Sequence, residues 1–565
     1  MDTTLLDAAN AWIAGDPDPD TRAHLQALVD AGDEPEVRAC VDGRLEFGTA
    51  GLRGVMGAGP LRMNRAVVIR TTRGLADHLL GVEGAADAGV VVGFDARHHS
   101  LQFAHDTVGV LAAAGIRVHF FPTPQPTPLV AYAQRVLGAA AGVVVTASHN
   151  PPEDNGYKVY AEGAAQIVPP TDARIAAAIA AVGPANEVPI VGVDHDLVGL
   201  LGGEVIDRYF ADIAAARPSV DGPDLRIVYT PLHGVAGEHV LRALAEGGYA
   251  DVHIVASQAE PDGAFPTVRF PNPEEPGAMD AAEALARDVD AALVLANDPD
   301  GDRLAAGYRP GDEVRLLSGN QIGVLLADHV LRNGDADRPL VISSIVSTPM
   351  LRSIGDAYGA HTEVTLTGFK WICAAARILE LDGGHTFVFG FEEALGSSVG
   401  TVVRDKDGIG AAVVFADLVR SLHGAGQTID DRLRDLARDH GLWVSHQLSI
   451  TRPGASGRVE IDAAMARLAE VTPERLAGHE VVAATDFRVG AESRPAWLTT
   501  TDLVSLDLPD GRAMIRPSGT EPKCKIYVDL SSALGEDDDL DAATARLEQD
   551  AAEVAADLAR FVGFE

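Results

Sequence analysis

Short apolar runs alternate with alanine-rich stretches along most of this chain. Runs rich in Val, Ile and Leu are typical of buried strands, and the stretches between them have apolar residues at helical spacing. We expect strands at residues 89–94, 116–121, 140–145, 226–229, 291–295 and 386–389. We expect helices over residues 321–331, after Ser318, and over residues 541–561. Strands that alternate with helices indicate α/β domains built on parallel sheets.

An apolar strand followed by a polar loop occurs three times. The loops at 146–151, 297–303 and 390–396 begin about 150 and then about 100 residues apart, which suggests three α/β domains of related design. From about residue 427 the pattern changes, and we expect a last domain of a different type. Glycine-containing junctions near Gly202, Pro310 and Gly424 serve as boundaries. The predicted domains are residues 1–204, 205–312, 313–428 and 429–565.

Composition excludes some classes of partner. The chain has 565 residues, of which 47% are hydrophobic, so each domain can bury a core. Its net charge of −37 should repel nucleic acid and anionic membranes, and an anionic substrate needs a local basic pocket. The 3 cysteines have no metal-binding spacing and fit a reducing cytoplasm. No apolar stretch is long enough to span a membrane, and the acidic N-terminal segment is unlike a signal peptide.

Ser148 is a candidate nucleophile. It follows the apolar run 140–145, at the end of a strand where α/β proteins place chemistry. The Gly-x-Ser-x-Gly turn of the hydrolases is absent, which disfavours acyl transfer and leaves a phosphate carried on Ser148 as an alternative. His149 is either its base or a residue that organises the loop. Lys158 either returns to the site or is an ordinary surface lysine.

The segment Asp298-Pro-Asp-Gly-Asp-Arg303 is a candidate metal site. Carboxylates at alternate positions converge if the backbone curls, and Gly301 permits this. Three carboxylates in one loop, Asp298, Asp300 and Asp302, suit Mg²⁺. The spacing does not fit an EF-hand, and the alternative is an ordinary acidic turn. Its position after a buried strand favours the metal site.

Two further loops suggest binding of sugar and phosphate. Glu392 and Glu393 lie between Gly390 and Gly396, where they either accept hydrogen bonds from sugar hydroxyls or begin a helix. From this loop alone, the helix N-terminus is favoured. A later segment supplies a guanidinium, hydroxyls and backbone N–H groups suited to a phosphate, through Arg516, Ser518, Gly519 and Thr520. Arg53, in the glycine-rich segment 47–54, either belongs to a tight turn or neutralises a moving phosphoryl group.

Together these segments resemble the α-D-phosphohexomutase superfamily, which includes phosphoglucomutase and phosphomannomutase. The resemblance covers nearly the whole chain, with Thr-Ala-Ser-His-Asn-Pro at 146–151 similar to the phosphoserine loop. The loops at 298–303, 392–396 and 516–522 are similar to the metal, sugar and phosphate loops. Gly-Phe-Asp-Ala-Arg at 93–97, Thr-Pro-Leu-His-Gly at 230–234 and Thr-Gly-Phe-Lys at 367–370 strengthen it. The strings Phe-Pro-Asn-Pro-Glu-Glu and Gly-Phe-Glu-Glu-Ala resemble the branch of phosphoglucomutase-2 and phosphopentomutase most.

The resemblance implies a fold and a mechanism. The fold is α/β, with three related mixed α/β domains plus a C-terminal α+β domain around a central cleft. Ser148 would carry a phosphoryl group, give it to a sugar phosphate and recover the other phosphoryl from the resulting bisphosphate. The implied catalytic residues are Ser148, Arg53, Lys158 and His149, and the implied ligands of Mg²⁺ are Ser148, Asp298, Asp300 and Asp302. The implied substrate-binding residues are Arg303, Gly368, Lys370, Glu392, Arg516, Ser518, Gly519 and Thr520.

Further expectations concern the substrate and the setting. A hexose phosphate, with glucose preferred, is the expected substrate, and a sugar 1,6-bisphosphate is the expected activator. Ala394 stands where many members of the family have Ser, and Gly396 and Phe369 stand where the dual-specificity bacterial enzymes have His. Lys370 is the nearest polar substitute for the histidine missing at Phe369. Mannose and pentose phosphates are therefore alternatives, and a phosphatase or a non-catalytic phosphosugar-binding protein is a remote one. We expect a cytoplasmic monomer or dimer that binds neither nucleic acid nor membrane.

Overall fold

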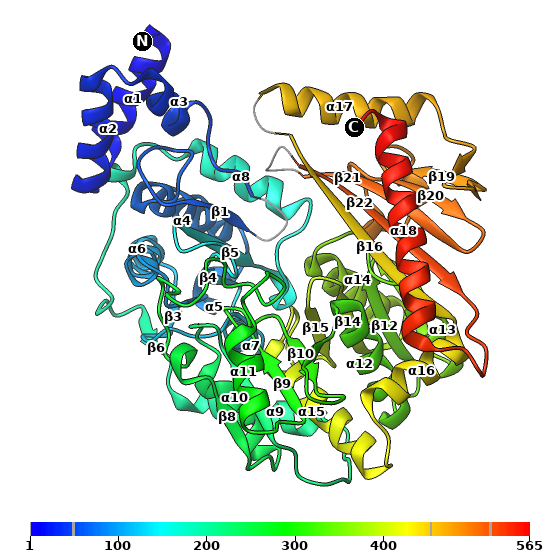
Figure 1. Ribbon diagram of the computed structural model, residues 1–565. Helices are drawn as coiled ribbons and strands as arrows, with labels where there is room; N and C mark the ends of the chain where they lie inside the picture. The colour runs from blue at the N-terminus through cyan, green and yellow to red at the C-terminus, as the bar shows by residue number, and fades with distance from the viewer. Residues whose placement is uncertain (1, 48–50, 453–454, 519–522, 565) are drawn as a thin grey trace. The chain divides into compact units, whose positions relative to one another are not determined.

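The chain folds into two compact units (Figure 1). The computed structural model describes residues 2–47, 51–452, 455–518 and 523–564. Unit 1 comprises Met1–Arg217, Asp224–Leu316 and Gly396–Ala416. Unit 2 comprises Pro218–Pro223, Leu317–Leu395 and Asp417–Glu565. The six strands and two helices expected from the sequence are all present, with ends that differ by at most three residues.

The first sheet of unit 1 is mixed. Its strands, in spatial order, are β1 (Leu52–Val55), β5 (Asp154–Tyr160), β4 (Ala141–Val145), β2 (Val90–Phe94), β3 (Val118–Phe120) and β6 (Val198–Leu200). The pairs β4/β2, β2/β3 and β3/β6 are parallel, whereas β4/β5 and β5/β1 are antiparallel. The expectation of parallel sheets is thus wrong at this edge. Residues 146–153, which join β4 to β5, are too few for the crossover that a parallel pair needs.

Helices cover the central strands of this sheet. They are α4 (Arg65–Leu80), α6 (Ser100–Ala113), α7 (Thr127–Leu137) and α8 (Thr171–Ala181). α4 packs against α6 and α8, and both α6 and α7 contact β2. Every residue of β2 and β4 is buried. Strands buried on both faces have no polar face, which explains why they are continuous apolar runs in the sequence.

Three short helices precede this sheet and were not expected. They are α1 (Thr3–Gly15), α2 (Pro19–Ala31) and α3 (Glu34–Val41), drawn in blue in Figure 1. Each begins after an aspartate whose side chain accepts a hydrogen bond from the first turn, namely Asp2, Asp18 and Asp33. Leu5, Leu25, Val37 and other apolar side chains form a small core of their own between the helices.

The second sheet of unit 1 repeats the mixed design. Its order is β11 (Arg315–Leu316), β10 (Ala305–Tyr308), β9 (Leu293–Ala296), β7 (Ile227–Thr230) and β8 (Val252–Ile254). The pairs β9/β7 and β7/β8 are parallel, whereas β9/β10 and β10/β11 are antiparallel. α11 (Asp280–Asp288) packs against β7 and β9. In both sheets, a buried strand runs into a polar loop and then into an antiparallel neighbour.

Unit 2 begins with a parallel arrangement. β13 (His361–Thr365), β12 (Pro339–Ser344) and β14 (Thr386–Glu392) are neighbours, with β12 parallel to both others. α12 (Gly319–Asn333), α13 (Met350–Ala357) and α14 (Phe369–Gly383) pack against these strands or one another. A capping box of Ser318 and Gln321 starts α12, which confirms the helix expected after Ser318.

The C-terminal part of unit 2 is an antiparallel sheet covered by helices. Its order is β16 (Leu442–Thr451), β22 (Lys523–Ser532), β21 (Gly511–Pro517), β20 (Val504–Leu508) and β19 (Ala483–Asp486). α18 (Leu540–Val562), red in Figure 1, packs along β16 and β22 and supplies Val554 and Leu558 to their core. This α+β part differs in type from the preceding sheets, as the change of pattern after residue 427 predicted.

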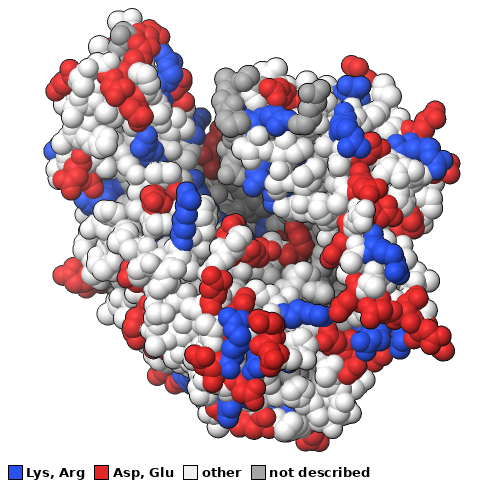
Figure 2. Space-filling model, viewed as in Figure 1, with Lys and Arg blue, Asp and Glu red and all other residues white. Residues whose placement is uncertain are grey.

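The surface matches the acidic composition. Figure 2 shows acidic side chains scattered over the face in view, with basic side chains interspersed among them. Within the described residues, every helix is too short or too polar to cross a lipid bilayer.

Gly156, on β5, tests the close packing at the edge of the first sheet. A Cβ atom there would lie 2.5 Å from the backbone oxygen of Thr146 and 2.8 Å from that of Leu52. We expect Gly156→Ala to lower the free energy of unfolding of unit 1 by about 1–3 kcal/mol, because neither carbonyl can swing away. Gly203→Ala is the control, since a Cβ there meets nothing within 4 Å. Equal melting temperatures of the two variants in calorimetry would refute this packing.

Candidate active site

Ser148 lies in a strained loop at the end of β4. Its φ of 56° is in the left-handed region, and its side chain is 2% exposed. The Ser148 N–H donates to Thr146 Oγ1 at 2.8 Å, and Thr146 Oγ1 donates to Asp95 Oδ2 at 2.6 Å. A non-glycine residue keeps this conformation only where its surroundings enforce it. The loop therefore presents the Ser148 hydroxyl in a fixed direction.

Arg97 is the main support of this loop. Its Nη2 donates to the backbone oxygens of Ser148 at 2.6 Å and Asn150 at 2.5 Å. Its Nη1 donates to that of Pro151 at 2.7 Å, and its Nε lies 3.3 Å from Asp95 Oδ2. One planar guanidinium thus ties several carbonyls of the loop to β2. The sequence showed Arg97 only as part of a motif and gave it no role.

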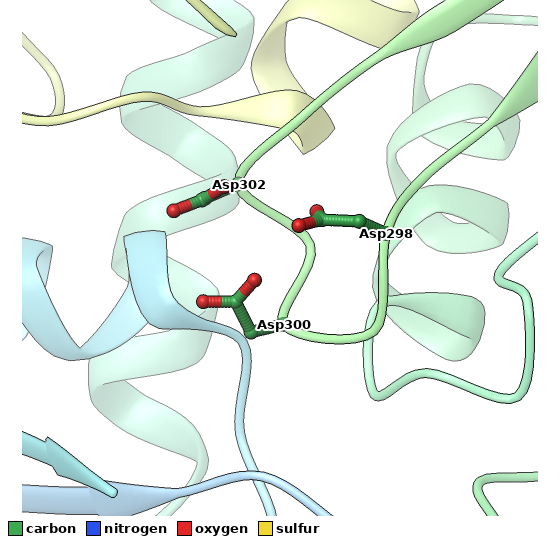
Figure 3. Close-up of side chains that lie close together, drawn as sticks. All are labelled: Asp298, Asp300 and Asp302. Carbon is green, nitrogen blue, oxygen red and sulfur yellow. The ribbon is translucent and has the colours of Figure 1, made fainter. Parts of the chain in front are cut away.

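The three aspartates of the 298–303 segment converge. The loop joins β9 to β10, and Figure 3 shows the side chains of Asp298, Asp300 and Asp302 close together. All three are fully buried, and one carboxylate oxygen of each lies within 4.8 Å of the others. Gly301 has a φ of 71°, so glycine permits the curl as expected. The Arg303 N–H closes the turn by donating to Asp298 Oδ1 at 3.0 Å.

The hydrogen bonding of this cluster fits a bound metal ion. Asp300 Oδ1 and Asp302 Oδ1 are buried and have no hydrogen-bond partner among the described residues. A buried carboxylate oxygen without a partner is costly, and a cation would satisfy both. Hard oxygen donors of this kind suit Mg²⁺ and similar ions. The buried Asp298, Asp300 and Asp302 can therefore bind a metal.

Two lysines offset the charge of the cluster. Lys158 Nζ donates to Asp300 Oδ2 at 2.6 Å and to Asp302 Oδ2 at 2.9 Å. Lys406 Nζ lies 3.2 Å from Asp302 Oδ2 and 3.3 Å from Asp405 Oδ1. Burial alone would lower the pKa of Lys158, but Asp300 and Asp302 outweigh burial and raise it. Lys158 is therefore a charged, buried residue at the site.

Ser148 contacts both the cluster and His149. Its hydroxyl donates to Asp298 Oδ2 at 2.8 Å, and its Oγ lies 3.0 Å from His149 Nδ1. Burial, with nearby Arg303 and Arg53, holds the pKa of His149 well below its usual value, so the ring is neutral. A hydroxyl has one proton to donate. With that proton on Asp298, a neutral His149 donates from Nδ1 and holds the Ser148 oxygen in place.

Other elements of unit 1 complete the surroundings. Thr127, the first residue of α7, donates from Oγ1 to Asp300 Oδ2 at 2.6 Å. Arg53 pairs with Gly156 across β1 and β5, and its Nη1 lies 3.5 Å from Asn150 Oδ1. The sequence missed Thr127 and Lys406. The only sequence feature that marks Lys406 is the charged string Asp-Lys-Asp at 405–407. In the structure all three of these charged residues are buried.

Unit 2 contains residues 392–395 of the predicted sugar segment, and Gly396 begins a stretch of unit 1. Glu392 is the last residue of β14 and is 8% exposed. A turn with Leu395 at a φ of 64° follows, and the chain enters β15 (Gly396–Val399). The helix N-terminus favoured from this loop alone is therefore wrong, because the apolar run of β14 continues to Glu392 as a strand.

The neighbours of Glu392 are anchored within unit 2. Glu393 accepts hydrogen bonds from Ser344 Oγ at 3.0 Å and Ser347 Oγ at 3.3 Å. Gly368 has a φ of 111° and precedes α14, which places Lys370 in the first turn of that helix. Glu392 thus lies at the end of a strand and Lys370 at the start of a helix.

The predicted phosphate segment also lies in unit 2. Arg516 is on β21 opposite Lys525 of β22. The charges of Arg516 and Glu393 both affect the pKa of the buried Tyr527, Glu393 raising it and Arg516 lowering it. Burial is the main reason that the pKa of Tyr527 is raised. The Ser518 N–H donates to the Lys523 oxygen at 2.7 Å. Gly519 and Thr520 lie outside the described residues.

The predicted site residues thus fall into two groups. Unit 1 brings together Ser148, Arg53, Lys158, His149, Asp298, Asp300, Asp302 and Arg303. Unit 2 holds Gly368, Lys370, Glu392, Arg516 and Ser518. The first group has the character of a phosphoryl-transfer site, with a hydroxyl beside buried carboxylates and cations.

Comparison with protein families agrees with this geometry. The descriptions "Phosphoglucomutase/phosphomannomutase, alpha/beta/alpha domain" I, II and III match residues 44–185, 207–311 and 318–439. The C-terminal domain of the same family matches residues 460–554. The chain belongs to the phosphoglucomutase/phosphomannomutase family.

Relatives with three different names are similar to the chain. A probable phosphomannomutase of Haemophilus influenzae is 41% identical, over 83% of this chain and 93% of the relative. A phosphoglucomutase of Staphylococcus epidermidis is 34% identical, over 86% and 91%. A phosphopentomutase of Mus musculus is 35% identical, over 95% and 92%. The protein is therefore a mutase, an isomerase of the phosphotransferase type.

A solved structure supports the fold. The crystal structure of a putative phosphomannomutase from Thermus thermophilus has a TM-score of 0.68 to this chain and 22% sequence identity. The similarity covers 92% of this chain and 99% of that one. The α/β architecture with a distinct C-terminal domain is thus shared with a solved relative.

Lys158 offers a test of the buried cluster. Lys158→Met leaves Asp300 and Asp302 without their main counter-charge, and we expect a loss of about 3–5 kcal/mol in the free energy of unfolding in EDTA. Mg²⁺ should raise the melting temperature of this variant more than that of the natural chain, since the ion replaces the missing charge. The partly exposed Lys525 provides the control, Lys525→Met, which should change little. No response of Lys158→Met to Mg²⁺ would contradict the metal site.

Proposed function

We propose that this protein interconverts a hexose 1-phosphate and the hexose 6-phosphate, with glucose preferred, through a phosphoserine at Ser148. The observation that carries this proposal is the hydrogen bond of the Ser148 hydroxyl to Asp298, inside the buried group of three aspartates. A serine hydroxyl beside a cation-binding cluster suits transfer of a phosphoryl group, whose charge needs compensation.

The reaction is two transfers in sequence. In the first, a sugar hydroxyl attacks phosphorus on Ser148, the bond from phosphorus to Oγ breaks, and a sugar bisphosphate forms. In the second, Ser148 Oγ attacks the other phosphoryl group of the bisphosphate and the isomeric sugar phosphate leaves. Each transfer moves one proton from the attacking hydroxyl to the site, and the leaving oxygen takes one back. A sugar 1,6-bisphosphate would therefore activate any unphosphorylated enzyme.

The residues of unit 1 have separate roles in this scheme. Lys158, which is protonated, donates a proton to a leaving oxygen. Arg53 stabilises charge on the moving phosphoryl group, and His149 holds Ser148 in place. Ser148 and the three aspartates would hold Mg²⁺, which supplies positive charge to the phosphoryl oxygens. Lys406 and Thr127 position Asp302 and Asp300.

The residues of unit 2 recognise the substrate in the same proposal. Glu392 accepts hydrogen bonds from sugar hydroxyls, with Gly368 and Lys370 beside the sugar. Arg516, Ser518, Gly519 and Thr520 bind the phosphate that is not being transferred, and Arg303 of unit 1 assists substrate binding. We retain the division into domains 1–204, 205–312, 313–428 and 429–565, with a cytoplasmic monomer or dimer, as predictions.

The choice of sugar is the open part of the proposal. Relatives named phosphomannomutase, phosphoglucomutase and phosphopentomutase are all similar to this chain. Ala394, two residues after Glu392, stands where many members of the family have Ser, and Phe369, next to Lys370, stands where the dual-specificity bacterial enzymes have His. A mannose or pentose phosphate with the same mechanism is the second candidate.

A substrate panel tests the function. Glucose, mannose, ribose and deoxyribose 1-phosphates are compared by kcat/KM with Mg²⁺ and a trace of sugar bisphosphate, and we expect the glucose ester to give the highest value. Ser148→Ala should lower exchange by about 10⁴-fold or more. Ser257→Ala is the control, since Ser257 is exposed in unit 1. A higher value for mannose or pentose overturns the glucose preference, and full activity of Ser148→Ala overturns the mechanism.

A further inference from the structure

A cavity lies in unit 1 between the N-terminal helices and the first sheet domain. Its volume is about 320 Å³, and it is lined by Trp12 and Gly15 of α1, Arg70 of α4, Pro60, Val182 and Pro184 among others. Most of the lining is apolar: alanine, valine, proline and the Trp12 ring. Pockets for small molecules begin at about 300 Å³, so this cavity has the size for one small ligand.

Arg70 places an uncompensated positive charge at this cavity. Its Nη2 donates to the Val182 oxygen at 2.9 Å, and its guanidinium lies 5.8 Å from the centre of the Trp12 ring. Its Nε is buried and has no hydrogen-bond partner, and no acidic side chain in the described parts of the chain forms an ion pair with it. A chain with 82 acidic residues could readily have supplied one. The side chain of Arg70 is half-buried, and a partly desolvated cation is stabilised by an anion beside it.

Trp12 adds a second unsatisfied donor at the same place. Its indole Nε1 is buried and, within the described residues, meets no acceptor. Buried N–H groups almost always find a partner, so an open donor in a cavity indicates a missing acceptor. The two open donors, Arg70 Nε and Trp12 Nε1, belong to side chains that already lie against each other.

The electrostatics point to an anion rather than a neutral acceptor. Burial lowers the pKa of Arg70, and the nearby charge of Arg44 lowers it further. An anion in the cavity would relieve both effects. A carboxylate offers two acceptor oxygens, one for each of the buried donors without a partner, Arg70 Nε and Trp12 Nε1, and an apolar body attached to it suits the alanine and proline lining.

We propose that this cavity binds a small carboxylate with an apolar body, with the carboxylate on Arg70 and Trp12 and the body against the alanine and proline lining. The cavity is separate from the Ser148 site. α1 lies outside residues 44–185, the first segment that matches the family.

The cavity has a structural route to the Ser148 site. Pro60, on its wall, belongs to the connection between β1, which carries Arg53, and α4. The Leu61 N–H donates to the Cys40 oxygen at 3.3 Å, and the Leu45 N–H donates to the Pro60 oxygen at 2.9 Å.

Benzoate and its neutral isostere benzamide are the probes, titrated into the full chain by calorimetry. We expect benzoate to bind with a Kd of about 10⁻⁴ to 10⁻³ M and benzamide to bind at least about tenfold more weakly. Arg70→Met, which keeps the length of the stem, and Trp12→Phe, which keeps a ring but removes the N–H, should each weaken benzoate binding. Arg516→Gln is the control, and its benzoate affinity should match that of the natural chain.

The outcomes are decisive in either direction. Weaker binding in folded Arg70→Met, with benzamide discriminated, supports the site. If Arg70→Met does not fold, Trp12→Phe and the comparison of benzoate with benzamide decide. The proposal is overturned if benzoate fails to bind at about 10 mM, if benzamide binds equally, or if Arg516→Gln rather than Trp12→Phe loses the binding. None of these results depends on the mutase activity, which is measured separately.

Discussion

The contact of Lys158 with Asp300 and Asp302 is the constraint on which the site in unit 1 depends. Three fully buried carboxylates in one turn would repel one another strongly without cations beside them. Lys158 reaches them from β5, which pairs antiparallel with β4 and lies between β4 and the edge strand β1. The antiparallel return of the chain after Ser148 is thus what brings the cation to the cluster.

The antiparallel pairing of β5 with β4 also explains how the Ser148 loop is held in place. β5 runs beside β4, so residues 146–153 form a short loop whose carbonyls face Arg97. Arg97 and the Asp95–Thr146 hydrogen bond hold Ser148 in a left-handed conformation. Asp298, in the loop that follows β9 of the second sheet, accepts a hydrogen bond from the Ser148 hydroxyl. A nucleophile held by backbone contacts needs little reorganisation during a transfer.

Strand ends were the part of this protein most predictable from sequence. Strands such as β4 and β9 are buried on both faces, so they are continuous apolar runs whose ends mark the loops with Ser148 and Asp298. The antiparallel edge was missed because apolar runs do not encode strand direction. The helix expected at Glu392 was wrong because glutamate near glycine is equally compatible with the end of a strand.

Contacts between distant segments were the least predictable part of the site. Lys406 lies 104 residues beyond Asp302 in the chain and reaches it only in the folded unit. Thr127 likewise acts through one hydrogen bond to Asp300, and Arg97 through several hydrogen bonds to loop carbonyls, and the sequence indicated neither contact. The motifs around Ser148 and Asp298 were visible because each is a short run with unusual chemistry. The residues that contact these motifs have no distinctive sequence pattern, so only the folded structure identifies them.

The location of the phosphoryl group tests the account most directly. The natural chain is incubated with glucose 1,6-bisphosphate and Mg²⁺, digested, and mapped by mass spectrometry. We expect a phosphate on Ser148 that is lost when excess glucose 1-phosphate is added. Phosphate on Asp298, or on neither residue while exchange proceeds, would contradict it.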